Sequence, residues 1–181
     1  ERLLLNTDDY VLNVDTKWRT HPDAKSVPRS NWKTDCAAIN DLYCLAITKH
    51  DGIASIRDLT PDHIPMLQSM LVDCPKAIEE IYGVPKDQLR IFVHYHPQFY
   101  HFHVHFTRLW NEIGCQVERG HLVQDIIQNL QMNPQYYSER TISYKLRTSD
   151  KLYKYIQEKQ SIDDKHADAD ADESIDEEEL E

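Results

Sequence analysis

Alternation of apolar and polar residues predicts several β-strands along this chain. A nearly continuous apolar run from Leu42 to Thr48 indicates one buried strand. Turn residues His96-Pro97-Gln98 separate two alternating segments, which predicts a hairpin of two long central strands. The predicted strands are residues 10–18, 42–48, 89–95, 99–107 and 141–146.

A periodicity of three to four residues predicts three helices. Thr60-Pro61-Asp62 is a strong helix start, and the apolar stripe that follows runs to Gly83, which should end the helix. Pro75 should kink or split this helix. Shorter helices are predicted over residues 122–130 and 150–160.

The most informative segment of the predicted hairpin reads His101-Phe102-His103-Val104-His105-Phe106. Successive side chains of a strand point to opposite faces, so three imidazoles would share one face and three apolar side chains the other. His94 would return beside them if the two hairpin strands pair. Five of the 10 histidines therefore gather in residues 94–105.

Three interpretations of this cluster compete. Buried histidines can be structural, but each of three would need its own hydrogen-bond partner. A His-x-His pair can bind a metal, but it needs a further ligand that the interleaved apolar residues do not supply. The third interpretation is nucleophilic catalysis, in which an imidazole attacks phosphorus and its neighbours set the tautomer and protonate the leaving group.

Composition and charge indicate one globular domain with an acidic end. The 181 residues are 40% hydrophobic, and no apolar run approaches the roughly 18 residues of a membrane helix. Of the net charge of -11, residues 161–181 contribute most, with eleven acidic residues and one lysine. We expect a domain over residues 1–160 and a disordered acidic tail over residues 161–181.

Cysteine spacing and loop composition add two expectations. The four cysteines form no CxxC pair, which favours reduced intracellular thiols. Residues 19–34 are rich in Pro, Ser, Lys and Asp and should form a surface loop. The chain does not begin with Met, so we expect a fragment of a longer protein.

Several motifs occur in the order in which one known family has them. The histidine run resembles the histidine-triad signature, and residues 94–107 are more specifically similar to the scavenger mRNA-decapping enzymes, or m7GpppX diphosphatases. Residues 14–18 look like that family's cap-binding segment. Residues 56–63 and 117–122 match its flanking motifs, so the resemblance spans residues 1–160.

The resemblance implies a fold and a reaction. The fold would be α+β and histidine-triad-like (HIT-like), an antiparallel sheet with packed helices. The reaction would be hydrolysis of the mRNA 5′ cap m7GpppN, as a dinucleotide or on short oligonucleotides, within 3′-to-5′ mRNA decay. It would yield m7GMP and a nucleoside diphosphate or diphosphate-ended RNA through a covalent histidine intermediate, with no cofactor and no metal.

The resemblance also implies residue roles. His103 would be the nucleophile and His101 would orient it, while His94 and His105 would contact phosphate oxygens or the leaving group. Lys17 and Arg119 would neutralise phosphate charge, and Asp15 would bind the cap nucleoside. The implied substrate-binding set is Asp15, Lys17, His94, His96, Pro97, Gln98, Phe99, Tyr100, His101, His103, His105 and Arg119.

Partners and two departures complete these expectations. The family implies capped mRNA fragments as substrate, a homodimer, RNA-decay protein partners, no membrane, and a cytoplasmic and nuclear location. Nothing here corresponds to the family's N-terminal swapped domain. Thr16 stands where the family favours a larger apolar residue under the base.

Two alternatives remain open. The chain could be a non-catalytic cap-binding regulatory subunit. It could also be a general histidine-triad hydrolase of dinucleoside polyphosphates, without preference for the methyl group.

Overall fold

The computed structural model describes residues 2–33 and 39–161, and the chain divides into two compact units, Glu1–Ser143 and Tyr144–Glu181. The first unit holds the sheet and the histidines. In the second, residues 151–161 are helical. The predicted domain limit at residue 160 stays a prediction, and the predicted tail lies outside the described residues except for Ser161.

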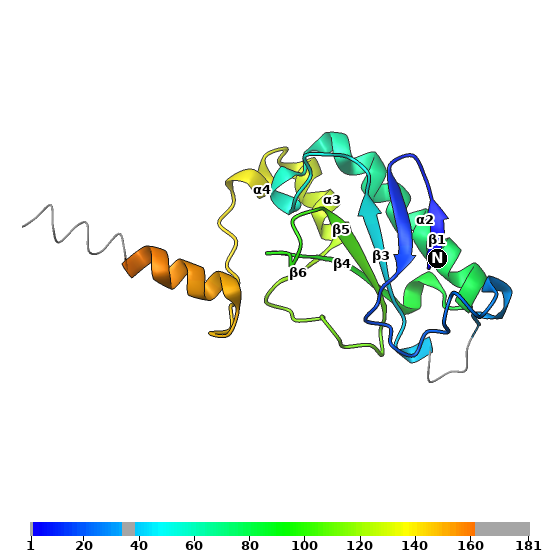
Figure 1. Cartoon of the computed structure of the whole chain (residues 1–181). Coiled ribbons are helices and arrows are strands. Elements are labelled where there is room, and N and C mark those ends of the chain that lie inside the picture. Colours follow the sequence, from blue (N-terminus) through cyan, green and yellow to red (C-terminus); the bar gives the residue numbers. More distant parts are fainter. Residues whose placement is uncertain (1, 34–38, 162–181) are drawn as a thin grey trace, which may run out of the picture. The chain divides into compact units, whose positions relative to one another are not determined.

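An antiparallel sheet of six strands forms the body of the first unit (Figure 1). The spatial order is β1-β2-β3-β5-β4-β6, so β3 and β5 occupy the centre. The strands are β1 Leu3–Asn6, β2 Tyr10–Val14, β3 Tyr43–Thr48, β4 Leu89–His94, β5 His103–Arg108 and β6 Gly120–Leu122.

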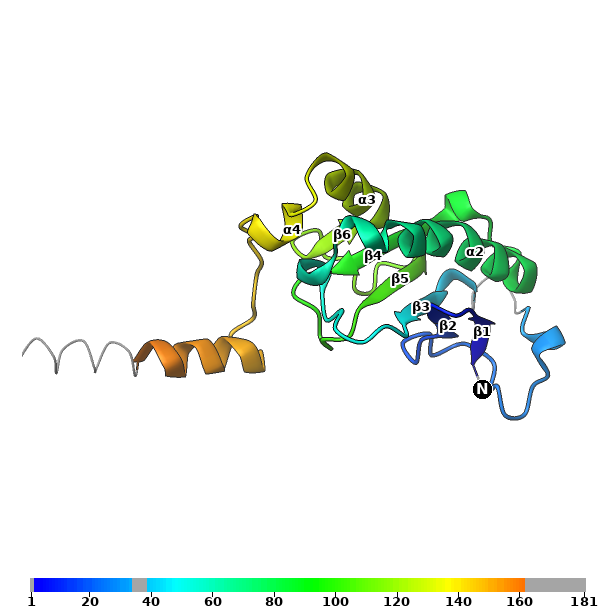
Figure 2. The ribbon, with the colours of Figure 1, turned by 90° about the horizontal axis from the view of Figure 1, so that it is seen from above.

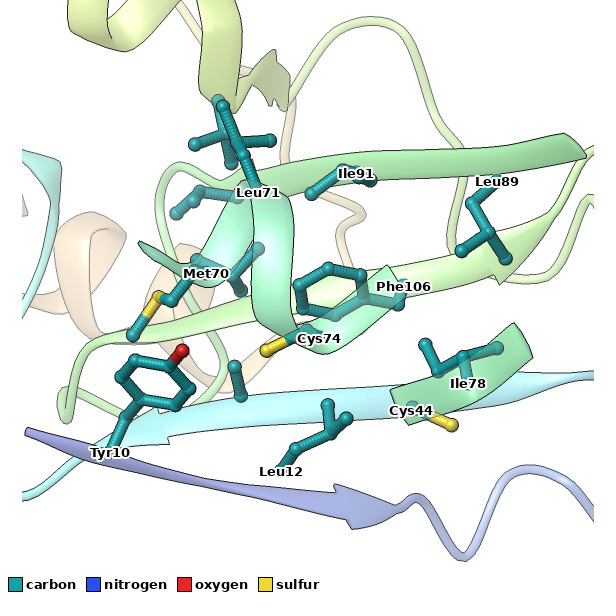
Figure 3. Close-up of a cluster of buried hydrophobic side chains, with 14 of the residues drawn as sticks. Tyr10, Leu12, Cys44, Met70, Leu71, Cys74, Ile78, Leu89, Ile91 and Phe106 are labelled. Carbon is teal, nitrogen blue, oxygen red and sulfur yellow. The ribbon is translucent and has the colours of Figure 1, made fainter. Parts of the chain in front are cut away.

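One face of this sheet is apolar and packs against α2, Ile64–Tyr82. Figure 3 shows Met70, Leu71 and Cys74 of the helix against Phe106 and Ile91 of the sheet. We call this side of the sheet the core face; its central members are Leu12, Cys44, Ala46, Ile91, Val104 and Phe106, all buried. Burial of this apolar area is the main favourable contribution to folding.

A second helix of the first unit continues the same layer. α3, Val123–Met132, packs against α2 and buries Val123, Ile126, Ile127 and Leu130 (Figure 2). α4, Tyr136–Glu139, follows it, and short 3-10 turns occur at η1 Arg29–Asn31, η2 Ile56–Asp58, η3 Pro61–His63 and η4 Lys86–Gln88. The predicted α+β fold, an antiparallel sheet with packed helices, is confirmed.

Most predicted elements are present, with shifted ends. The strands predicted at 10–18, 42–48 and 89–95 correspond to β2, β3 and β4, and the hairpin pairing of β4 with β5 is confirmed. Gly83 ends α2 in a left-handed conformation, with φ of 68°. The helix does not split at Pro75, so that alternative was wrong.

Two strand predictions need correction. β5 begins at His103 rather than residue 99, because Phe102 is buried and its backbone bonds to Ile53 and Thr48 instead of continuing the ladder with β4. Residues 141–146 form no strand. Their side chains do alternate in burial, but β6 rather than this segment pairs with β4.

The predicted surface loop at 19–34 is more internal than its composition suggests. His21 and Trp32 are buried, at 6% and 2% exposure. Arg29 donates hydrogen bonds to the carbonyl oxygens of Leu3 and Leu4, at 3.3 and 2.7 Å, and so ties the loop to the edge strand β1. The part of the loop beyond residue 33 lies outside the described residues.

Two further observations concern cysteines and membranes. Cys44, Cys74 and Cys115 carry free thiols, while Cys36 lies outside the described residues. Within the described ranges, no helix combines the length and apolarity that a membrane span requires.

Candidate active site

Strand register brings the histidines together on the side of the sheet opposite the core face. His105 lies opposite Leu45 of β3 and Phe92 of β4, and His103 lies opposite Ile47. Opposed residues point to the same side, so His94, two residues after Phe92, joins them. We call this side the site face; its members here are Tyr43, Leu45, Phe92, His94, His103 and His105.

The imidazoles of the site face are in mutual contact. The ring centroids of His94 and His105 are 4.3 Å apart, and those of His103 and His105 are 4.9 Å apart. The ring of Phe92 stacks on His105 at 5.0 Å. The predicted return of His94 beside the histidine strand is therefore observed.

A backbone carbonyl fixes the tautomer of His103. Its Nδ1 donates a hydrogen bond of 2.7 Å to the carbonyl oxygen of His101, and a carbonyl can only accept. Burial is the largest cause lowering the pKa of His103, with the charge of Lys17 adding to it, so the ring is held neutral. The neutral ring with a proton on Nδ1 presents a free lone pair on Nε2, the form a nucleophile needs.

His94 is held in a fixed orientation in a similar way. Its Nε2 donates to the carbonyl oxygen of Gly114, at 2.6 Å, from a site that is 5% exposed. Burial lowers the pKa of His94 to about 4, and the charges of Arg119 and Lys17 act in the same direction. His94 is therefore neutral at physiological pH.

His105 is the most enclosed of the three, at 2% exposure. Its Nδ1 lies 2.9 Å from the hydroxyl oxygen of Tyr43. Burial is the largest cause that holds its pKa well below the usual value, and protonation of the adjacent His94 would lower it further. Its Nε2 is buried and has no hydrogen-bond partner among the described residues.

His101 differs from the other three, because it precedes β5 and its side chain is exposed. Its Nε2 donates to the carbonyl oxygen of Thr48, at 2.8 Å. The sequence placed all three imidazoles of the run on one strand face, and for His101 this was wrong. Its observed contact with His103 is made by its main-chain carbonyl.

The predicted charged residues approach the cluster from β2 and from the loop before β6. Asp15 is buried and accepts a hydrogen bond of 2.7 Å from the backbone nitrogen of Lys17, which fixes the turn after β2. The Nζ of Lys17 lies 3.5 Å from the hydroxyl of Tyr43 and 4.9 Å from its ring centroid. Arg119 is held by Gln116, and its charge lowers the pKa values of His94 and His105.

Residues 96–100 lie within the connection between β4 and β5, which runs from residue 95 to residue 102. Pro97 is buried, His96 bonds the carbonyl of Pro97 through Nδ1, and Gln98 is exposed. Phe99 and Tyr100 are 68% and 60% exposed, and they lie next to the histidines in sequence. Their predicted binding role stays a prediction.

Sequence reasoning missed two residues of this site. Tyr43 is the bridge between Lys17 and His105, and Gly114 supplies the carbonyl for His94. The geometry of a strand over residues 42–48 could have placed Tyr43 on the side of Leu45, but not beside His105. Nothing in the sequence around Gly114 indicates that its carbonyl oxygen would face His94. In the described part of the chain, no three His, Cys, Asp or Glu side chains are grouped to hold a metal ion.

The fold and the site face together define a histidine-triad-like protein with a nucleophile-ready imidazole. A family model described as "Scavenger mRNA decapping enzyme C-term binding" matches residues 6–120. The chain therefore belongs to the scavenger mRNA decapping enzyme family.

Curated relatives named "m7GpppX diphosphatase" agree with this. The human protein is 40% identical over 155 residues, covering 85% of this chain and 41% of its own length. The Caenorhabditis elegans protein is 34% identical over 154 residues, covering 84% of this chain and 44% of its own length. The chain thus spans about two fifths of the relatives it matches. A solved structure titled "Hnt3 in complex with DNA and guanosine" covers 88% of this chain and 87% of its own at 13% identity, with a TM-score of 0.41 too low to add to the assignment.

Proposed function

We propose that this chain is the catalytic part of an m7GpppX diphosphatase that hydrolyses the 5′ cap of short capped RNA fragments or of the cap dinucleotide. The observation that carries the proposal is the hydrogen bond from Nδ1 of His103 to the carbonyl of His101, which leaves Nε2 free to attack. The names of the relatives supply the substrate class.

In the proposed reaction, Nε2 of His103 attacks the phosphorus next to 7-methylguanosine. A nitrogen–phosphorus bond forms and the bridging phosphorus–oxygen bond breaks, which releases a nucleoside diphosphate or a diphosphate-ended RNA. Water then cleaves the nitrogen–phosphorus bond and frees m7GMP, and His103 returns to its neutral form. No metal or cofactor takes part.

The neighbouring groups stabilise the charge that develops on the phosphate. Lys17 and Arg119 are the fixed cations, and His105 supplies a hydrogen bond to a phosphate oxygen or to the leaving group. His94, whose Nε2–H is donated to the carbonyl of Gly114, lies beside these groups against the phosphate chain. Asp15 and residues 96–100 bind the cap nucleoside and the phosphate chain. Thr16, which is exposed, offers the methylated base a smaller surface than an apolar residue would.

The wider setting is part of the proposal. The active protein is a homodimer that acts in 3′-to-5′ mRNA decay, together with protein partners of that pathway, in the cytoplasm and the nucleus. The names of the relatives support the cap substrate alone, and these relatives are more than twice as long as the matched region.

The test is hydrolysis by the full chain, measured on m7GpppG and on unmethylated GpppG. We expect m7GMP to form, and His103→Ala to lower the rate by at least about 10³-fold. His50→Ala, which removes an exposed histidine bonded to Asp9, is the matched control and should not change the rate. A rapidly quenched reaction should show a nucleotidyl adduct on His103 by mass spectrometry.

Two results would overturn the proposal. Absence of m7GMP formation by the wild-type chain would leave a non-catalytic cap-binding subunit. Equal rates on methylated and unmethylated substrates would instead indicate a general dinucleoside-polyphosphate hydrolase.

A further inference from the structure

Tyr43 connects a cation to the innermost histidine of the site face. The side chain is fully buried at the start of β3. Its hydroxyl oxygen lies 2.9 Å from Nδ1 of His105 and 3.5 Å from Nζ of Lys17. A side chain added at Gly114 would place its Cβ only 3.2 Å from this oxygen, so the glycine leaves room for the hydroxyl where it stands.

The direction of these two hydrogen bonds follows from what each group can donate. A lysine ammonium has three protons and no lone pair, so Nζ of Lys17 donates and the hydroxyl oxygen of Tyr43 accepts. Burial, and then the charge of Asp15, raises the pKa of Tyr43, so the phenol keeps its own proton.

That phenolic proton needs an acceptor, because leaving a buried hydroxyl unsatisfied is costly. Among the described residues, Tyr43 has only one other hydrogen-bond partner, Nδ1 of His105. The hydroxyl therefore donates to Nδ1, and Nδ1 must carry a lone pair. A neutral imidazole with a lone pair on Nδ1 carries its proton on Nε2.

We propose that Tyr43 is a positioning residue that sets the tautomer of His105, so that an Nε2–H donor stands beside the Nε2 lone pair of His103. The inference rests on the proposed function, to which it adds Tyr43 as a residue that positions His105. The two adjacent imidazoles are then held in opposite tautomers, one by the carbonyl of His101 and one by the hydroxyl of Tyr43.

The opposite tautomers suit opposite tasks. The Nε2 lone pair of His103 attacks phosphorus. The Nε2–H of His105 can donate a hydrogen bond to a phosphate oxygen while negative charge develops on that oxygen. The Nε2 atom of His105 is buried and has no partner among the described residues, which is what a donor reserved for a substrate oxygen would show. In the other tautomer, Nε2 would present a lone pair to that oxygen and repel it.

The first test reads the tautomer directly, without substrate. In the ¹⁵N-labelled full chain at neutral pH, long-range ¹H–¹⁵N correlation distinguishes the protonated from the unprotonated ring nitrogen, and His105→Gln assigns the signals. We expect Nε2 of His105 to be protonated in the wild type. Tyr43→Phe should replace this pattern with one averaged over both tautomers.

A matched control separates the tautomer from the loss of a buried hydroxyl. The hydroxyl of Tyr82 lies 2.8 Å from Nε2 of His21, outside the site, and is equally enclosed. Tyr82→Phe should leave the His105 pattern and the hydrolysis of m7GpppG unchanged. Tyr43→Phe should lower kcat about tenfold with little change in KM.

The inference and the proposed function fail in different ways. A wild-type His105 protonated on Nδ1, or a Tyr43→Phe spectrum identical to the wild type, would overturn the role of Tyr43 whether or not the chain hydrolyses caps. The wild type could instead show a protonated Nε2 on His105 but hydrolyse no m7GpppG. Tyr43 would then set the tautomer of His105 as proposed, but a catalytic role for that tautomer would be overturned together with the proposed function.

Discussion

The two faces of β5 are built from alternate residues of the same six-residue strand, but different interactions stabilise them. Val104 and Phe106 on the core face are fully buried and need only apolar neighbours of the right volume. His103 and His105 on the site face each need a particular partner atom, from His101 and Tyr43. Apolar burial is non-directional, whereas a buried imidazole is stable only in the tautomer that its partner selects.

The largest effect should come from truncating the core face. Phe106→Ala should lower the free energy of unfolding by about 3–5 kcal/mol, because it removes a ring that lies between β5 and α2. Chemical denaturation measures this. The activity of the remaining folded protein should stay close to wild type, since the site face is intact.

The control for this truncation lies on the same helix that covers the core face. Val72 of α2 is 60% exposed, and Val72→Ala should change stability by no more than about 0.5 kcal/mol. If Phe106→Ala abolished activity in protein that is still folded, the two faces would not be separable.

The next effect is the acid sensitivity of the site face. The unfolded chain protonates its histidines near pH 6.5, whereas burial lowers the pKa of His94 in the folded chain to about 4. Between these values the unfolded state binds more protons, so stability is complete above pH 6.5 and falls as the pH drops towards 4. The loss from His94 alone should reach roughly 3 kcal/mol at most.

Denaturation at several pH values checks this window. His94→Gln keeps an N–H for the carbonyl of Gly114 but does not titrate, so its stability should fall less steeply below pH 6.5. Val72→Ala, which removes no titratable group, should retain the wild-type slope. An equal slope in His94→Gln and wild type would contradict the assignment.

The smallest effect on stability should come from a substitution of Gly114. This substitution should lower activity much more than it lowers stability. Gly114 has φ of 78°, so Gly114→Ala should cost about 1 kcal/mol of stability from backbone strain. Its new Cβ would also press on the hydroxyl of Tyr43 and lie 3.7 Å from Cε1 of His94. Hydrolysis should therefore fall roughly tenfold, because the imidazoles lose their alignment.

Gly52→Ala is the matched variant for this test. Gly52 also has a positive φ, of 85°, but a Cβ there would meet nothing within 4 Å. It should show the same loss of stability in thermal denaturation without the loss of activity. Equal activity in both variants would mean that Gly114 has no part in aligning the site.

Patterns that depend on one segment could be predicted from the sequence. The alternation of β4 placed His94 on the side of Phe92, and the glycine after Tyr82 ended α2 correctly. The turn at residues 96–98 gave the hairpin, and with it the meeting of His94 and His105. These features are local, so the residues themselves specify them.

Features that depend on distant partners could not be predicted. The start of β5 at His103 depends on bonds from Phe102 to residues 48 and 53, and the strand predicted at 141–146 had the right pattern but no partner. Tyr43 reaches His105 only because β3 pairs with β5, which are separated by a long helix and a further strand in the chain. Register between such strands is a property of the whole sheet.

The link from Arg29 to β1 has a consequence for association between chains. β1 is an outer strand of the sheet, and an outer strand with free carbonyls is a template on which another chain can add. Arg29 occupies the carbonyl oxygens of Leu3 and Leu4, and places a charged side chain where an incoming strand would have to lie. The described part of the loop therefore covers main-chain acceptors of β1 with a charged side chain, which hinders the addition of another strand there.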